Sequence, residues 1–205
     1  FLLYLFLLLV SIIYGFYRFW EILHPFKLLV ILELVIFLGE LSGAIFEEGI
    51  GTNYPFYLAL QIVQFGFFGF IFYYLFTPYG KWLKLFSLGS PVLAVLGILI
   101  KTLYQGIFAF PSFGSLLLSL YMSVACMLLF SNMIKSPVHT PILRQSEFWF
   151  TAGSLFFHTV TFFIFGYFKG LSDQGPVPQW GYVVIRTSNF ILYGCYFLSL
   201  YFASG

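Results

Sequence analysis

Seven stretches of this chain are apolar enough and long enough to cross a lipid bilayer, and they restrict the fold more than any other feature. An α-helix rises 1.5 Å per residue, so about 20 apolar residues cross a hydrocarbon core of about 30 Å. The sequence therefore predicts an all-α polytopic membrane protein, a bundle of seven transmembrane helices. The predicted spans are residues 1–19, 26–46, 56–77, 91–105, 112–134, 148–168 and 180–203.

The composition excludes a soluble fold. Hydrophobic residues make up 61% of the chain and charged residues 8%, whereas soluble domains carry about 25% charged residues. Residues 1–205 are thus expected to form one membrane domain, with no cleavable signal peptide in the first span. Cys126 and Cys195 lie in mid-span and are predicted to be small core residues. The net charge of +2 gives no reason to expect nucleic acid as a partner.

The orientation follows from the basic residues in the short loops, because Lys and Arg are retained on the cytoplasmic side. Six basic residues lie in the first, third and fifth loops, and two lie at or between the opposite span ends. The chain should have its N-terminus outside and its C-terminus in the cytoplasm, and we expect a bacterial inner membrane. The six are Arg18, Lys27, Lys81, Lys84, Lys135 and Arg144, and the two are Lys101 and Lys169.

The fourth span is unusual because residues 91–105 are short for a bilayer. Either the helix begins earlier and kinks at Pro91, or it is short and thins the membrane around it. The preceding residues 81–88 are interpreted as an interfacial segment. Ser90 and Ser146 each precede a predicted helix and are interpreted as N-caps.

Polar residues inside the spans are the candidates for function, because they are costly in hydrocarbon and tend to face a partner or a cavity. Glu33 and Glu40 are seven residues apart and should share one helical face, with Glu40 about 10 Å below the outer surface. Two later spans place further polar residues at that depth, which predicts one ligand-binding cluster. Its members are Glu40, Gln61, Gln64, Arg186 and Asn189.

Two other interpretations of this cluster stay open. Glu40 and Arg186 could form an ion pair, directly or through a bridging group, with the amides linking the helices. Alternatively, the groups could be unrelated side chains that reach toward the membrane surface. Gly39 and Gly43, in the spacing G-x-x-x-G, should let a neighbouring helix approach Glu40, and Gly66 and Gly69 are the predicted matching surface.

Glu33 and His158 are candidates for proton handling. The alternative for Glu33 is an acid bonded to a backbone or hydroxyl partner, and for His158 a hydrogen-bonded packing residue. His24, His139 and His158 lie too far apart along the spans for one zinc site, so no metal and no cofactor is expected. No catalytic motif is present, which favours a protein that is not an enzyme.

Two segments resemble a known group of proteins. The residues Glu147-Phe148-Trp149-Phe150 open one span, and Thr52-Asn53-Tyr54-Pro55 open another, after a span that carries glutamates. The chain thereby resembles small bacterial seven-span membrane proteins that look like sensor or partner subunits of signalling kinases. The resemblance implies a receptor-like role in signalling, and it brings no established functional residue.

The leading hypothesis is a receptor-like or accessory membrane subunit, which binds a small or lipid-like ligand near the outer leaflet. It would act through a protein partner at its cytoplasmic face. The alternatives are a membrane enzyme or transporter that uses the intramembrane Glu and His residues, and a structural subunit of a larger membrane complex.

Overall fold

A computed structural model shows an all-helical chain, and it describes residues 2–50, 53–107, 112–135, 140–171 and 179–203. Short 3-10 turns η1 (Thr77–Tyr79) and η2 (Ile142–Arg144) precede α4 and α6. The long helices are α1 (Leu2–Tyr17), α2 (His24–Ile50), α3 (Tyr54–Leu75), α4 (Lys81–Gln105), α5 (Ser112–Lys135), α6 (Ser146–Leu171) and α7 (Gln179–Phe202).

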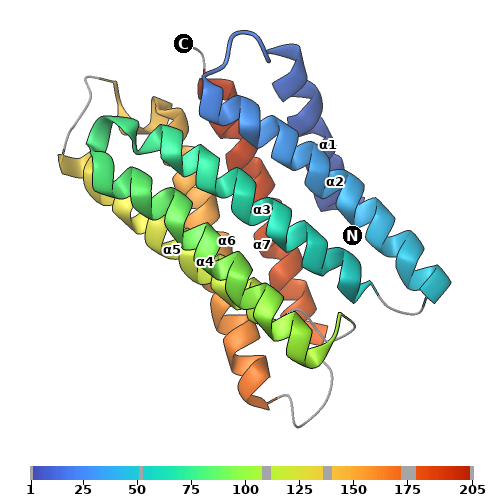
Figure 1. Cartoon of the computed structure of the whole chain (residues 1–205). Coiled ribbons are helices and arrows are strands. Elements are labelled where there is room, and N and C mark those ends of the chain that lie inside the picture. The colour runs from blue at the N-terminus through green and yellow to red at the C-terminus, as the bar shows by residue number, and fades with distance from the viewer. Residues whose placement is uncertain (1, 51–52, 108–111, 136–139, 172–178, 204–205) are drawn as a thin grey trace.

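The helices form a closed ring in which each one packs against its neighbours in sequence (Figure 1). Helix α1 closes the ring by packing on both α2 and α7, and α3 also contacts α5 across the interior. The α1–α2 turn, η1 and η2 lie at the same end of the bundle as the end of α7, which we call the basic end. This up-and-down order agrees with the alternation predicted from the loops.

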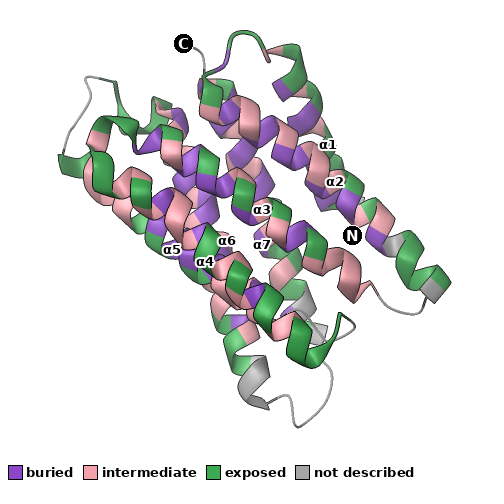
Figure 2. Cartoon of the chain, viewed as in Figure 1, coloured by how far each residue is buried: buried purple, intermediate pink, exposed green. Residues whose placement is uncertain are grey.

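Exposed residues cover the outside of the bundle (Figure 2), and many of them are large apolar side chains, as on a lipid-facing surface. Leu93 is 71% exposed, Leu103 85% and Phe163 67%. Six of the described helices are long and apolar enough to cross a membrane, while α1 is shorter. Their length and composition are those of the spans of an integral membrane protein, and the interior of the bundle is packed largely with aromatic rings. The fully buried rings are Phe26, Phe65, Phe72, Phe76, Phe150 and Tyr196.

For the fourth span, the alternative in which the helix begins before Pro91 is confirmed, whereas the predicted interfacial segment and the Ser90 cap are wrong. Helix α4 runs unbroken from Lys81 to Gln105, so residues 81–88 are part of it and Ser90 is not a cap. Pro91 lies inside the helix and lacks the N–H that would bond to the carbonyl of Ser87. The hydroxyl of Tyr121 on α5 donates to that carbonyl instead, at 3.1 Å. A donor from another helix thus lets the proline continue the helix.

Gly39 permits a close contact between α2 and α3, and Gly43 makes an ordinary van der Waals contact with the same helix. A Cβ on Gly39 would meet Leu60 of α3 at 3.0 Å, and one on Gly43 would meet the hydroxyl of Tyr57 at 3.5 Å. The predicted close approach beside Glu40 is therefore confirmed, and α3 is the neighbour. The predicted matching surface is wrong: Gly66 faces open space, and Gly69 faces Ser87 and Pro91 of α4.

At the basic end, one arginine holds the helix ends together. Arg18 donates to the hydroxyl of Tyr14 at 3.2 Å and to the carbonyl of Tyr201 at the end of α7, at 3.0 Å. It also forms an ion pair with Glu21 at 3.0 Å. The hydrogen bond to Tyr14 is the largest cause that raises the pKa of the guanidinium, and the hydrogen bond to Glu21 is the next. Arg18 therefore remains charged and ties the α1–α2 turn to α7.

Helix α6 begins two residues before its predicted start. Ser146 is its first residue, and its hydroxyl donates to the carboxylate of the next residue, Glu147, at 3.1 Å. Ser146 therefore lies within the helix and is not the predicted N-cap, and Glu147 is in the first turn.

Candidate functional site

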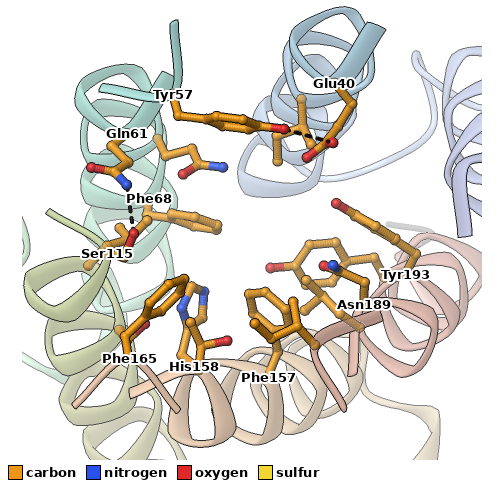
Figure 3. Close-up of a pocket in the computed structure, with 18 residues that line it drawn as sticks. Glu40, Tyr57, Gln61, Phe68, Ser115, Phe157, His158, Phe165, Asn189 and Tyr193 are labelled. Atoms are coloured by element: carbon orange, nitrogen blue, oxygen red, sulfur yellow. Dashed lines mark hydrogen bonds between the residues drawn. The ribbon is translucent and has the colours of Figure 1, made fainter. Parts of the chain in front are cut away.

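A cavity of about 230 Å³ lies inside the bundle, between α2, α3, α5, α6 and α7 (Figure 3). Its wall mixes apolar and aromatic side chains with a small number of polar ones, the usual make-up of a ligand pocket. The lining residues are Ile36, Glu40, Tyr57, Gln61, Gln64, Phe68, Ser115, Leu118, Ser119, Phe157, His158, Thr161, Phe165, Ile185, Asn189, Leu192, Tyr193 and Tyr196.

Glu40 of α2 is held by two phenol groups. The hydroxyl of Tyr4 on α1 donates to its Oε2 at 3.1 Å, and the hydroxyl of Tyr57 on α3 donates to the same atom at 3.3 Å. Because Gly39 and Gly43 allow α3 to lie close to α2, Tyr57 can reach the carboxylate. The two bonds orient the carboxylate and leave its second oxygen, Oε1, for other groups.

Gln61 links α3 to α5. Its Nε2 donates to the hydroxyl of Ser115 at 2.7 Å, and the side chain is buried. Gly114 lies directly against the Gln61 amide, where a Cβ would collide with Oε1. A glycine at this position is therefore needed for the amide to fit between the two helices beside the cavity.

His158 of α6 is 4% exposed and reaches into the cavity from the side opposite Glu40 (Figure 3). Its ring meets Phe68 and Phe157 edge to face, with centroids 6.0 and 5.1 Å away. Within the described part of the chain, its Nδ1 has no hydrogen-bond partner, and neither has Oγ1 of Thr161, one turn further along α6. Buried polar atoms without partners are costly, so these two favour a bound polar group in the cavity.

The cavity brings together most of the residues that were predicted to bind a ligand. Glu40, Gln61, Gln64 and Asn189 all line it, at the matched depth that the sequence indicated. Arg186 does not line it and is exposed on α7. Between the described residues, the only ion pair within 4.0 Å is Arg18–Glu21. The predicted direct contact between Glu40 and Arg186 is therefore not formed.

The two candidates for proton handling lie in different surroundings. His158 lines the cavity, which the sequence alone could not decide. Glu33 does not line it and is fully buried, with both carboxylate oxygens 2.9 Å from the hydroxyl of Ser11 on α1. This is the hydroxyl-bonded arrangement that was the alternative for Glu33. The two glutamates do share one face of α2, since Tyr4 and Ser11, also seven residues apart, bind them from α1.

Sequence reasoning missed the tyrosines of the site. Tyr4, Tyr57 and Tyr193 place hydroxyl groups or rings at the cavity or at Glu40. In a chain with 24% aromatic residues, no spacing distinguishes these tyrosines from those at the membrane surface. Glu40 itself was the one signal that could have indicated them, because an intramembrane carboxylate needs hydrogen-bond donors near it.

Among the described residues, no three His, Cys, Asp or Glu side chains are grouped to hold a metal ion. Comparison with protein-family models, curated proteins and solved structures gave no match to this chain. The cavity and its chemistry are therefore the features of this chain that bear on its function.

Proposed function

We propose that this protein is a seven-span receptor-like membrane subunit that binds a small ligand in the cavity between α2, α3, α5, α6 and α7. The observation that carries the proposal is a cavity with polar groups from several helices, two of them buried without hydrogen-bond partners in the described chain: Nδ1 of His158 and Oγ1 of Thr161. Its volume of about 230 Å³ is below the usual range for drug-sized ligands, so the ligand is small.

The proposal competes with a purely structural role for the polar residues. Polar side chains that only link helices are expected to pair with one another, as Ser11 does with Glu33. The partnerless atoms of His158 and Thr161 do not fit that expectation. A ligand with both polar and apolar parts would bond to them and also contact the surrounding Phe and Tyr rings.

The topology belongs to the same proposal, with α1 as a seventh span and Glu48 outside. Helix α1 has 16 residues, about 24 Å at 1.5 Å per residue, which a local thinning of the bilayer would accommodate. Single cysteines at positions 84 and 144 should resist an impermeant thiol reagent added to intact cells, and one at position 48 should react. Labelling of 84 and 144 from outside would contradict this orientation.

A partner at the basic end completes the proposed receptor role, in a bacterial inner membrane. Trp20 and Trp82 are highly exposed there, and Lys81 and Lys135 are exposed at the same end of the bundle. Exposed aromatic and cationic side chains at a membrane surface suit an anionic protein surface or anionic lipid. Replacing Lys81 and Lys135 by Gln should weaken co-purification of the partner, whereas Arg18 is unsuitable for this test because it holds the fold together.

A second candidate function is a membrane enzyme or transporter, favoured by one observation: Glu40 and His158 line the same cavity. A carboxylate and an imidazole around one ligand are a pair that can exchange protons. This candidate predicts turnover or movement of the ligand, which the receptor proposal does not.

The binding proposal is tested with small fluorinated probes and fluorine-detected NMR on the purified protein in nanodiscs. Probes that enter the cavity should broaden with the wild type and much less with Ser119→Phe or Asn189→Phe. Both substitutions place a ring in the cavity, and the comparison removes the signal from probes dissolved in lipid. Circular dichroism checks that each variant is folded. The probes should include a small alcohol, amine, amide and acid. If each of them broadens equally with the wild type and with both filled variants, the binding proposal fails.

A further inference from the structure

The charges around the cavity are one-sided. Among the residues that the structure describes, Glu40 is the only acidic one in the cavity wall, and none of the Lys or Arg side chains lines it. Arg186 on α7 is exposed and does not line the cavity, although it lies close enough to Tyr4, a hydrogen-bond partner of Glu40, to interact with it electrostatically. A bound group therefore meets one carboxyl group and no cationic side chain from the described residues.

The carboxylate of Glu40 is also arranged to receive a donor. Tyr4 and Tyr57 approach from α1 and α3 and donate to the same oxygen, Oε2. Phenol groups on one oxygen fix the orientation of the carboxylate and supply part of the hydrogen bonding that a charge needs away from water. The ligand can then bond to Oε1 with a carboxylate that is already positioned.

Aromatic rings line the cavity both on the side of Glu40 and on the side of His158. Tyr57, Tyr193, Tyr196 and Phe157 line the cavity, and Tyr193 and Asn189 lie on the side toward Glu40 in Figure 3. The faces of aromatic rings attract cations, and rings with a carboxylate are the usual environment for ammonium groups.

From these contacts we propose that the ligand is a small organic cation, a monoamine whose ammonium group binds Glu40 and whose apolar body lies among the aromatic rings. This inference rests on the proposed binding function and names the ligand class. The far end of the ligand lies near His158 and Thr161, where a hydroxyl or amide group would satisfy Nδ1 and Oγ1. The cavity volume of about 230 Å³ corresponds to about seven or eight water molecules in the liquid. That is enough for a ligand with one ring and a short chain.

Three probes of one shape test the charge preference: para-fluorophenethylamine, para-fluorophenylethanol and para-fluorophenylacetate. At neutral pH they are a cation, a neutral molecule and an anion. In wild-type protein the amine should bind at least about tenfold more tightly than the alcohol, and the acid should bind least. Each affinity is measured relative to Ser119→Phe, so partition into lipid cancels.

The Glu40→Gln variant keeps the shape of the side chain and removes its charge. The amine should then lose about tenfold in affinity, while the alcohol changes by about twofold or less. Glu48→Gln, an exposed position on the same helix, is the matched control and should leave all three affinities unchanged. Should Glu40→Gln not fold, the amine-to-alcohol ratio in the wild type alone decides.

The outcomes separate the two proposals. An alcohol that binds the wild type as tightly as the amine would overturn the amine inference and leave the binding function standing. The same holds if Glu40→Gln lowers both affinities equally. Absence of cavity binding for all three probes would overturn the amine inference directly, and the wider probe set then decides the binding function.

Discussion

Buried polar groups next to the basic end are paired, whereas those at the cavity are paired only in part. In the half next to the basic end, buried hydroxyls are paired: Ser11 with Glu33, Ser154 with Tyr196 at 2.9 Å, and Ser199 with the carbonyl of Ser146 at 2.9 Å. At the cavity, Glu40 and Gln61 have partners, but His158 and Thr161 each have a polar atom without one among the described residues.

This difference distinguishes polar residues that stabilise the fold from polar residues that are available to bind a ligand. Polar residues are costly in a membrane wherever they lie, so the sequence alone marks Glu33 and Glu40 alike. The structure shows Glu33 closed in by packing and Glu40 open to a cavity. We therefore expect substitutions in the paired half to lower stability, and substitutions at the cavity to alter binding.

The largest effect is expected at Glu33. Glu33→Ala removes a fully buried side chain and the partner of Ser11, and should lower the free energy of unfolding by about 3 kcal/mol. Glu40→Ala, at a site that already adjoins a cavity, should cost about 1 kcal/mol. Unfolding in mixed micelles titrated with sodium dodecyl sulfate measures both. Equal losses at the two positions would break the comparison.

A smaller effect is expected at the proline of α4. Tyr121→Phe leaves the Ser87 carbonyl without its donor and should cost about 1 kcal/mol. In the Pro91→Ala background that carbonyl regains a backbone N–H, so the same change should cost much less. If the two substitutions simply add in the same unfolding measurement, Tyr121 does not compensate for the proline.

The smallest effect is expected at Thr161. Thr161→Val replaces a partnerless hydroxyl by a methyl group of similar shape, so stability without ligand should stay within about 0.5 kcal/mol or rise. Ser154→Ala removes the hydrogen bond to Tyr196 and is the matched control. It should lower the free energy of unfolding by about 0.6 kcal/mol or more. A loss at Thr161 as large as at Ser154 would mean that its hydroxyl has a structural partner.

Depth along a helix was predictable from the sequence, and rotation about its axis was not. Counting residues placed Glu40, Gln61, Gln64 and Asn189 at one level, and they do line one cavity. Arg186 was placed with them, but three residues rotate a helix by about 300°, which leaves it about 60° away from Asn189 and outside the wall.

Contacts between different helices were also difficult to predict from the sequence. Pro91 matched the rule for helix starts, and the sequence could not decide between that start and an earlier one, because the compensating donor, Tyr121, comes from a different helix. The G-x-x-x-G spacing at Gly39 succeeded because its contact needs only small residues on one face of one helix.

The central claim is that the cavity beside Glu40 holds a small cationic ligand, and locating such a ligand tests it most directly. Crystals grown in lipid with para-bromophenethylamine would report the bromine by its anomalous scattering. We predict a bromine peak inside the cavity, on the side of His158, with the amine toward Glu40, and no peak in crystals of Ser119→Phe. A cavity filled only with water, with bromine confined to the outer surface of the bundle, would contradict the account.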